Sequence, residues 1–264
     1  MGTRIRLNFQ KALKFLLLML AMILPTACVT PSLNKENAAK YAAYAMMSSD
    51  VYHKNGADKV SPFPIEKIDW KMEKTAGNNE HGLAYDVYFN EKSGERIVAF
   101  RGTEDATDWK DGNLLPLQYD DADRIFADCK TDNNEITAFA GHSLGGGLAL
   151  HMSVECGIPA YVFDTSPKVD LHNRNIRPAK RVLIYQKGEI LQPLRIFMLV
   201  QKDLISESYV HNRDLKGCVK GEEIFEGAIC EHDMTNLAMA ILKHGRQVNN
   251  NLQKFCDVLP GCKR

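Results

Sequence analysis

Apolar and polar residues follow two different periods along this chain, and the change of period predicts where helices and strands lie. Helical spacing begins after Asn34, a residue type that caps helices, and continues through an alanine-rich stretch to about Ser49. Strand-like runs follow at 68–74, 83–90 and 96–101, separated by turns rich in Gly, Asn and Ser. We expect these three runs to be hairpin-connected, antiparallel neighbours.

The second half of the chain mixes strands with helices. Short apolar runs predict strands at 135–140, 160–163, 181–185 and 194–201 and helices at 144–156 and about 234–247. Residues 103–121 are polar and irregular apart from the apolar run 114–117. A further helix is expected after residue 121, as far as Cys129. This order predicts a three-layer α/β sheet. Without an internal repeat or a low-complexity tract, one domain from 34 to 264 is the simplest division.

The N-terminal segment has the pattern of an export signal. Basic residues precede ten consecutive apolar residues at 15–24, and the small residues Thr26 and Ala27 stand directly before Cys28. Ten residues are too few to cross a hydrocarbon core about 30 Å thick. We therefore expect residues 1–27 to be a bacterial signal peptide of the lipoprotein type and residues 28–33 to be a tether.

Cys28 is the expected lipidation site, which would anchor the protein to a membrane. Val29 after it suggests, by analogy, sorting to the outer membrane. Soluble secretion is the alternative.

The remaining cysteines suit an oxidising compartment. The chain has seven cysteines, of which six remain when Cys28 is set aside, an even number in an exported protein. Three disulfides are expected, and although fifteen connectivities exist, we favour pairing of sequence neighbours: Cys129 with Cys156, Cys218 with Cys230, and Cys256 with Cys262. The cysteines lack the paired spacing of a zinc site.

The overall charge excludes one class of function. The 264 residues include 33 basic and 33 acidic side chains, so the chain has no net positive field to attract a polyanion. Nucleic-acid binding is therefore disfavoured.

The motif Gly141-x-Ser143-x-Gly145 lies between the predicted strand at 135–140 and the predicted helix at 144–156. At a sharp strand-to-helix turn a serine hydroxyl projects above the sheet only if residues two positions away lack bulky side chains. Glycine meets that demand on both sides. Ser143 is therefore a candidate nucleophile.

A nucleophilic serine needs a base that accepts its proton and an acid that orients the base. His232 lies in a loop-like stretch just before the last helix and is the favoured base, with His211 as its rival. Glu189 follows the second strand after Ser143, where the orienting acid is expected. Asp164 and Asp170 are the alternatives.

The negative oxygen of an acyl-transfer intermediate needs two hydrogen-bond donors. The backbone N–H of Leu144 is the expected first donor. The second should come from the loop after an earlier strand, and the strand at 96–101 runs into a glycine turn followed by Thr103.

Three motifs together resemble the class 3 lipase family of α/β-hydrolases: 100–103 (Phe-Arg-Gly-Thr), Asp108-Trp109 and 141–146 (Gly-His-Ser-Leu-Gly-Gly). The resemblance runs from about Asn34 to the last helix. It implies an α/β-hydrolase sandwich with a mostly parallel central sheet and antiparallel N-terminal strands. It also implies that Thr103 is an oxyanion residue, Ser143 the nucleophile and His232 the base.

The chain departs from this family at two positions. Asp164-Thr165 replaces the usual Phe-Gly before Ser166-Pro167, and Glu189 stands where the family has aspartate. Family lids often follow the oxyanion loop, so 114–117 is an expected lipid-contacting segment, with core packing as the equal alternative.

These observations predict a serine carboxylester hydrolase, a lipase or phospholipase that acts on lipid acyl esters in the bacterial envelope or outside it. Neither a metal nor an organic cofactor is needed. The alternative is a surface lipoprotein that keeps the fold and binds a ligand or partner without turnover. Amide or thioester hydrolysis by the same residues is a second enzymatic alternative.

Overall fold

The computed structural model describes residues 30–52, 62–102, 114–171, 176–195, 203–212 and 224–262. Cys28, Thr103, Cys218 and the apolar run 15–24 lie outside these ranges. One compact unit comprises Ser32–Arg264. Among the described residues, no helix combines the length and the apolar character that crossing a membrane requires.

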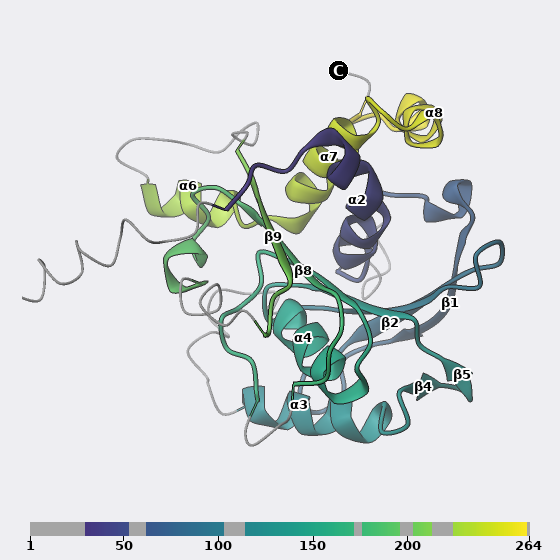
Figure 1. The fold of residues 1–264 in the computed structure, drawn as a ribbon, viewed down its shortest axis with the longest axis vertical. Helices are drawn as coiled ribbons and strands as arrows, with labels where there is room; N and C mark the ends of the chain where they lie inside the picture. The colour runs from purple at the N-terminus through teal and green to yellow at the C-terminus, as the bar shows by residue number, and fades with distance from the viewer. Residues whose placement is uncertain are drawn as a thin grey trace, which may run out of the picture. The chain divides into compact units, whose positions relative to one another are not determined.

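A seven-stranded sheet forms the centre of this unit, in the order β1-β2-β3-β6-β7-β8-β9 (Figure 1). Its strands are β1 (Trp70–Ala76), β2 (Tyr85–Asn90), β3 (Arg96–Phe100), β6 (Ala138–His142), β7 (Ala160–Phe163), β8 (Arg181–Gln186) and β9 (Glu207–His211). The pairs β1–β2 and β2–β3 are antiparallel, and every pair from β3 to β9 is parallel. The expected fold class, mostly parallel with antiparallel N-terminal strands, is confirmed.

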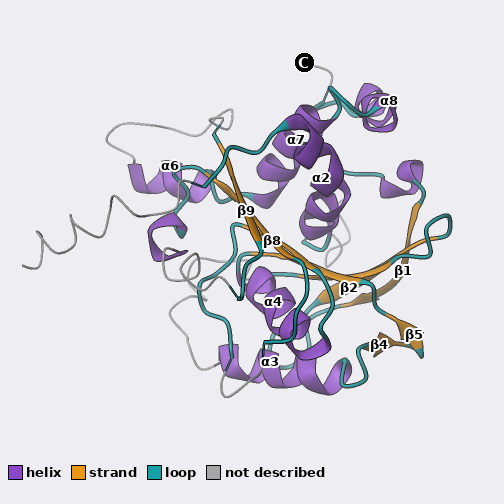
Figure 2. Ribbon diagram, in the orientation of Figure 1, coloured by secondary structure: helices purple, strands orange, loops and turns teal. Residues whose placement is uncertain are grey.

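Helices cover both faces of the sheet, as Figure 2 shows. On one side of the sheet lie α2 (Lys35–Asp50), α7 (Met234–Gly245) and α8 (Asn250–Val258), with α8 packed against α7; on the other side lie α3 (Leu114–Ile125) and α4 (Leu144–Cys156). Alternate residues of a strand pack into the two hydrophobic cores, one on each side of the sheet. In β3, Ile97 and Ala99 pack on the side of α2, whereas Val98 and Phe100 pack on the side of α4. The central strands β6, β7 and β8 are mostly apolar because both faces are buried, and their polar residues, Arg181, Gln186 and His142, stand at strand ends.

The first helix begins where the sequence predicts. The Asn34 side chain accepts a hydrogen bond from the backbone N–H of Asn37 and so caps α2. Tyr41 and Ala42 are fully buried on the face that packs on the sheet. The helices predicted at 144–156 and 234–247 also form, as α4 and α7.

The segment from Leu114 to Ile125 differs from the expectation. Helix α3 begins at Leu114 rather than after residue 121, so the apolar run 114–117 is helical. Pro116 is tolerated there because the first turn of a helix leaves its N–H groups without intrahelical partners. Leu117 is exposed, whereas Tyr119 and Ala122 pack in the core.

The predicted strand at 194–201 is wrong at its start, and the last strand lies further along the chain. Residues 194 and 195 belong to a 3-10 turn, η4 (Gln192–Arg195), in which Pro193 cannot donate to a strand ladder. The last parallel strand is β9, an edge strand whose Glu207, Ser208 and Tyr209 are only half-buried. A partly exposed edge strand needs few apolar residues. The apolar pattern of the sequence therefore did not predict β9.

Four short elements had no counterpart in the prediction. They are η2 (Ile65–Ile68), the hairpin strands β4 (Lys130–Thr131) and β5 (Asn134–Glu135), and α6 (Ile224–Cys230). Helix α8, capped by Asn249, was missed as well.

Disulfides form between Cys129 and Cys156 and between Cys256 and Cys262. The first ties the segment after α3 to the last residue of α4. Cys230 is also disulfide-bonded, and its expected partner Cys218 lies outside the described residues.

Candidate active site

Ser143 occupies the turn between β6 and α4 in a conformation that few residues adopt. Its φ is 54° and its ψ is −123°, which for a residue with a Cβ is a strained backbone. Two contacts hold it there: the Ser143 N–H donates to the Phe163 carbonyl at 3.1 Å, and the Ser143 carbonyl accepts the Ser166 N–H at 2.8 Å. The side chain is held at the carboxyl end of the sheet.

The flanking glycines are required by close backbone approach. A Cβ on Gly141 would overlap the carbonyl of Gly145, and a Cβ on Gly145 would overlap the carbonyl of Phe100 at the end of β3. In both cases the obstacle is backbone, which cannot rotate away as a side chain can. The spacing of the motif therefore follows from sterics.

His232 lies between α6 and α7 and contacts Ser143 directly. Its Nε2 is 3.0 Å from Ser143 Oγ and its Nδ1 is 2.8 Å from Glu189 Oε2. An ionised carboxylate can only accept, so Nδ1 carries the hydrogen and Nε2 can accept the serine proton. The next residue, Asp233, caps α7 by accepting from the Asn236 N–H, which fixes the chain immediately beside the imidazole.

Glu189 is buried in the loop after β8 and is held by several donors. Its Oε2 also accepts the Leu191 N–H at 2.7 Å, and its Oε1 pairs with Arg195 Nη1. Burial alone would raise the pKa of this carboxyl, but the hydrogen bond from His232 and the charge of Arg195 outweigh it and set the pKa below its ordinary value. Glu189 is therefore ionised near neutral pH.

Arg195 is a site residue that the sequence reasoning missed. Its side chain is 1% exposed, and its Nε donates to the Thr165 carbonyl at 2.6 Å while Nη1 pairs with Glu189. A signal was present: a carboxylate buried behind an imidazole needs a compensating cation, and Arg195 lies in η4, shortly after Glu189 in the chain.

Asp164, an alternative acid, follows β7 with a φ of 40°. Its carboxylate is fully buried; Oδ1 accepts the Gln186 N–H at 2.8 Å, and Oδ2 has no hydrogen-bond partner in the described part of the chain. Burial and the nearby charge of Glu189 raise the pKa of Asp164 well above its ordinary value.

Asp170 and His211, the alternative acid and base, bond to residues other than Ser143 and His232. Asp170 uses its backbone carbonyl to accept from His151 Nδ1 at 2.7 Å. His211 ends β9, where its Nδ1 is 2.9 Å from Gln186 Oε1. The structure thus brings His232 and Glu189, not His211 and Asp170, into hydrogen-bond contact along the path to Ser143.

His142 belongs to a second network, on the side of the expected oxyanion donors. Its Nδ1 is 2.9 Å from the Tyr52 hydroxyl, which also accepts the Gly102 N–H at 2.9 Å. Burial sets the pKa of His142 well below its ordinary value, so it is a neutral imidazole. Leu144 begins α4, where an N–H has no intrahelical acceptor and can serve a ligand. Thr103 follows Gly102 directly but lies outside the described residues.

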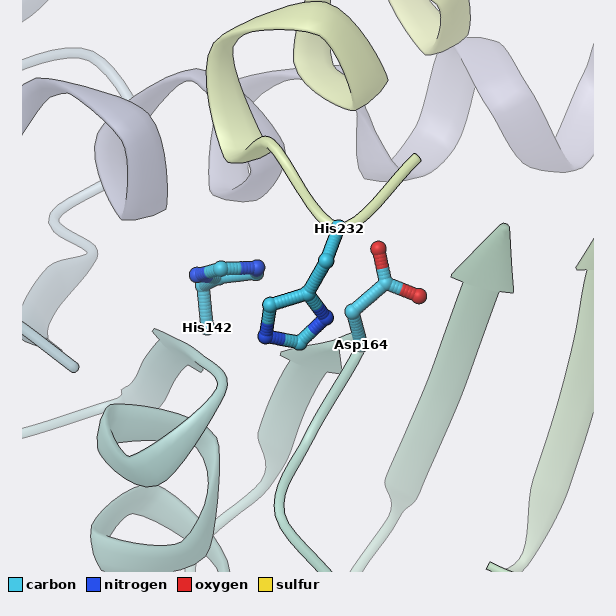
Figure 3. Close-up of side chains that lie close together, drawn as sticks. All are labelled: His142, Asp164 and His232. Atoms are coloured by element: carbon cyan, nitrogen blue, oxygen red, sulfur yellow. The ribbon is translucent and has the colours of Figure 1, made fainter. Parts of the chain in front are cut away.

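His142, Asp164 and His232 form a tight group, and Figure 3 shows the His232 ring between the other two side chains. Atoms of the three that could bind a metal lie within 4.8 Å of one another. Both ring nitrogens of His232, however, already bond to Ser143 and Glu189. A cation would have to break one of these bonds, so we assign the group to proton chemistry.

Comparison with known proteins finds a relative of similar sequence. A relative, the extracellular phospholipase A1 of Serratia liquefaciens, is 29% identical over 189 residues, which cover 66% of this chain and 58% of the relative. The chain thus spans less than two thirds of that protein's length.

Solved structures with similar folds include a lipase of Rhizopus microsporus var. chinensis, at 14% identity and a TM-score of 0.46 over 61% of this chain and 69% of that one. The native lipase–propeptide complex of Rhizomucor miehei gives 15% identity and a TM-score of 0.43 over 60% and 64% of the two chains.

A family model described as a phospholipase-like, Tle-like phospholipase domain matches residues 43–207, which is more than half of the chain. The matched segment contains Ser143, Asp164 and Glu189. The chain belongs to this phospholipase-like family.

Proposed function

We propose that this protein is a serine ester hydrolase that cleaves acyl esters of phospholipids, with Ser143 as nucleophile, His232 as base and Glu189 as orienting acid. The observation that carries the proposal is the continuous hydrogen-bond chain from Ser143 Oγ through both nitrogens of His232 to Glu189. Each residue is positioned independently, by the strained turn, by the start of α7 and by the loop after β8.

In the acylation step, Ser143 Oγ attacks the ester carbonyl carbon while its proton passes to His232 Nε2. The imidazolium that forms is stabilised by ionised Glu189 at Nδ1. Collapse of the tetrahedral intermediate breaks the bond to the alcohol, which leaves with the proton from Nε2. Water, deprotonated by the same nitrogen, then releases the fatty acid and restores Ser143.

The intermediate carries negative charge on the former carbonyl oxygen, and two donors are expected to bind it. The Leu144 N–H at the start of α4 supports the first assignment. Thr103, which matches the oxyanion residue of the lipase resemblance, is the proposed second donor. The network of Tyr52 and His142 supports this side of the site, because it fixes Gly102 immediately before Thr103.

Two observations support a lipid substrate. The Serratia relative is named a phospholipase A1. In addition, the segments that carry Glu189 and His232 each expose a large apolar side chain, Leu194 at 51% and Ile229 at 41%. The Ile190 N–H bonds to the Ala228 carbonyl at 3.2 Å, so the two segments lie side by side. We propose that an acyl chain contacts these two apolar side chains, which lie on the segments that carry the acid and the base.

We further propose that the protein acts outside the cytoplasm. The relative is described as extracellular, and the disulfides suit an oxidising compartment. Residues 1–27 as a signal peptide and Cys28 as a lipid anchor remain predictions. Mass spectrometry of the membrane fraction tests them: a diacylated Cys28 supports the anchor, and an unmodified secreted chain contradicts it.

The test of the function is Ser143→Ala in the oxidised full-length protein, assayed on phospholipid vesicles and on short soluble esters. We expect kcat to fall about 10⁶-fold with the fold intact. Ser166→Ala is the matched control: it removes a neighbouring hydroxyl that accepts from the Lys168 N–H at 3.2 Å and should keep activity.

A serine-reactive fluorophosphonate should label wild-type Ser143. Activity retained in Ser143→Ala, or folded wild-type protein that takes up no label, would contradict the proposal and favour a protein that binds without turnover. Cleavage of thioesters or amides in preference to phospholipids would contradict the proposed substrate class but not the proposed roles of Ser143, His232 and Glu189.

A further inference from the structure

Two buried carboxylates share one arginine behind His232. Asp164 is 0% exposed, Glu189 is 2% and Arg195 is 1%. Arg195 Nη1 pairs with Glu189, and Arg195 Nη2 lies 3.9 Å from Asp164 Oδ1. Two ionised acids on one buried guanidinium would leave a net negative charge in a region without solvent, which is costly.

The two buried carboxylates receive different numbers of hydrogen bonds. Glu189 receives hydrogen bonds from the Leu191 N–H, Arg195 and His232. Asp164 receives one, from the Gln186 N–H to Oδ1, and its Oδ2 meets no donor among the described residues. A buried anionic oxygen without a donor is strongly disfavoured, whereas a neutral carboxyl group at the same place costs much less.

The groups that face Asp164 come from every neighbouring element. Glu189 follows β8 and Glu231 precedes His232; both raise the pKa of Asp164 in addition to burial, while Arg195 in η4 and the Gln186 N–H oppose them. His142 at the end of β6 is neutral. The negative charges and the loss of solvent outweigh the single arginine.

We propose that Asp164 and Glu189 hold one proton between them at neutral pH, that this proton resides on Asp164, and that Asp164 is thereby a positioning residue which leaves one negative charge facing His232. The role in catalysis rests on the proposed function, because it concerns His232 as the base. The location of the proton does not depend on it.

One negative charge, rather than two, keeps His232 able to accept the serine proton. An atom of the Asp164 carboxylate lies within 4.8 Å of a ring nitrogen of His232, and Figure 3 shows the two groups side by side. A second negative charge at that distance would favour the imidazolium over the neutral imidazole that accepts the serine proton. A protonated aspartate adds no such charge and still accepts the Gln186 N–H.

Infrared spectroscopy of the oxidised full-length protein with ¹³C-labelled aspartate tests the proton directly. At pH 7 we expect the C=O stretch of a protonated aspartic acid, lost in Asp164→Asn and retained in Asp170→Asn, a matched change in the loop after β7. In Glu189→Gln the band should be lost at a lower pH than in the wild type, because Asp164 then faces Arg195 without the competing charge of Glu189. Absence of a protonated band in the wild type would overturn the proposal.

A band that is lost at the same pH in Glu189→Gln as in the wild type would also overturn it, because the two carboxylates would then not compete for one proton. This comparison decides the matter if Asp164→Asn fails to fold. Kinetics give a second readout: the acid limb of kcat/KM should lie at the same pH in Asp164→Asn as in the wild type. A limb one or more pH units lower in the variant would show that Asp164 is ionised in the wild type. The infrared result stands even if the protein hydrolyses no ester, so the two proposals fail separately.

Discussion

The two sides of His232 are built on different physical principles. The nucleophile side, Gly141 to Gly145, is a contiguous turn whose geometry follows from steric exclusion between backbones. The acid side gathers Asp164, Glu189 and Arg195 from the ends of two strands and from η4, and its arrangement follows from charge balance without solvent. The first side should respond to changes of side-chain volume, and the second to changes of charge and pH.

Among variants that keep Ser143, the largest effect is expected on the acid side. Glu189→Gln removes the charge that stabilises the His232 imidazolium and allows the wrong imidazole tautomer, so kcat should fall about 10⁴-fold, equivalent to roughly 5.5 kcal/mol. Steady-state kinetics with circular dichroism as a folding check measure this. Glu135→Gln, an exposed glutamate in the β4–β5 hairpin, is the control. A loss of less than tenfold would mean that another acid orients His232.

Arg195→Met should destabilise the fold by about 3–5 kcal/mol, because it leaves buried Glu189 without its cation. Urea unfolding monitors the change. The double variant Arg195→Met/Glu189→Gln should recover part of this stability, since neither buried charge remains. If the loss of unfolding free energy in the double variant equals the sum of the losses in the two single variants, the pairing of Arg195 with Glu189 does not stabilise the acid side.

Gly145→Ala should destabilise the nucleophile turn by about 1–3 kcal/mol, because its Cβ meets the Phe100 carbonyl and the strand cannot yield freely. This loss should be the same at pH 5 and pH 8, since no titrating group is involved. A loss that changes with pH would break the distinction between the two sides.

The smallest effect concerns acid stability. The folded pKa of Glu189 lies below the unfolded value near 4.5, so its ionised form contributes stability that is fully present above that value and is lost as the pH falls through the folded pKa. The stability gap between wild type and Glu189→Gln should therefore narrow on acidification. Denaturant titrations across the acid range measure it; a gap that widens would contradict the assigned direction.

Prediction from sequence succeeded where local rules act alone. The strand–Ser143–helix unit and the cap at Asn34 depend on neighbours within a few residues, so the pattern sufficed. Prediction failed where the tertiary environment determines the secondary structure. The 3-10 turn η4 forms where an apolar run predicted a strand. Strand β9 forms from half-exposed residues because an edge strand needs only one buried face. Helix α3 begins earlier than predicted because Pro116, which breaks a helix in its interior, fits the first turn.

The sequence by itself determined the sharp turn at Ser143, because glycine on both sides is a steric requirement of the backbone. It also limited the candidates for base and acid to a few residues at expected strand ends. Only the tertiary structure selected Glu189 as the contact of His232, recruited Arg195, and placed Asp164 beside them without a donor for Oδ2 among the described residues. Charge balance in a buried site depends on distances between segments that are far apart in the chain, and no local pattern encodes those distances.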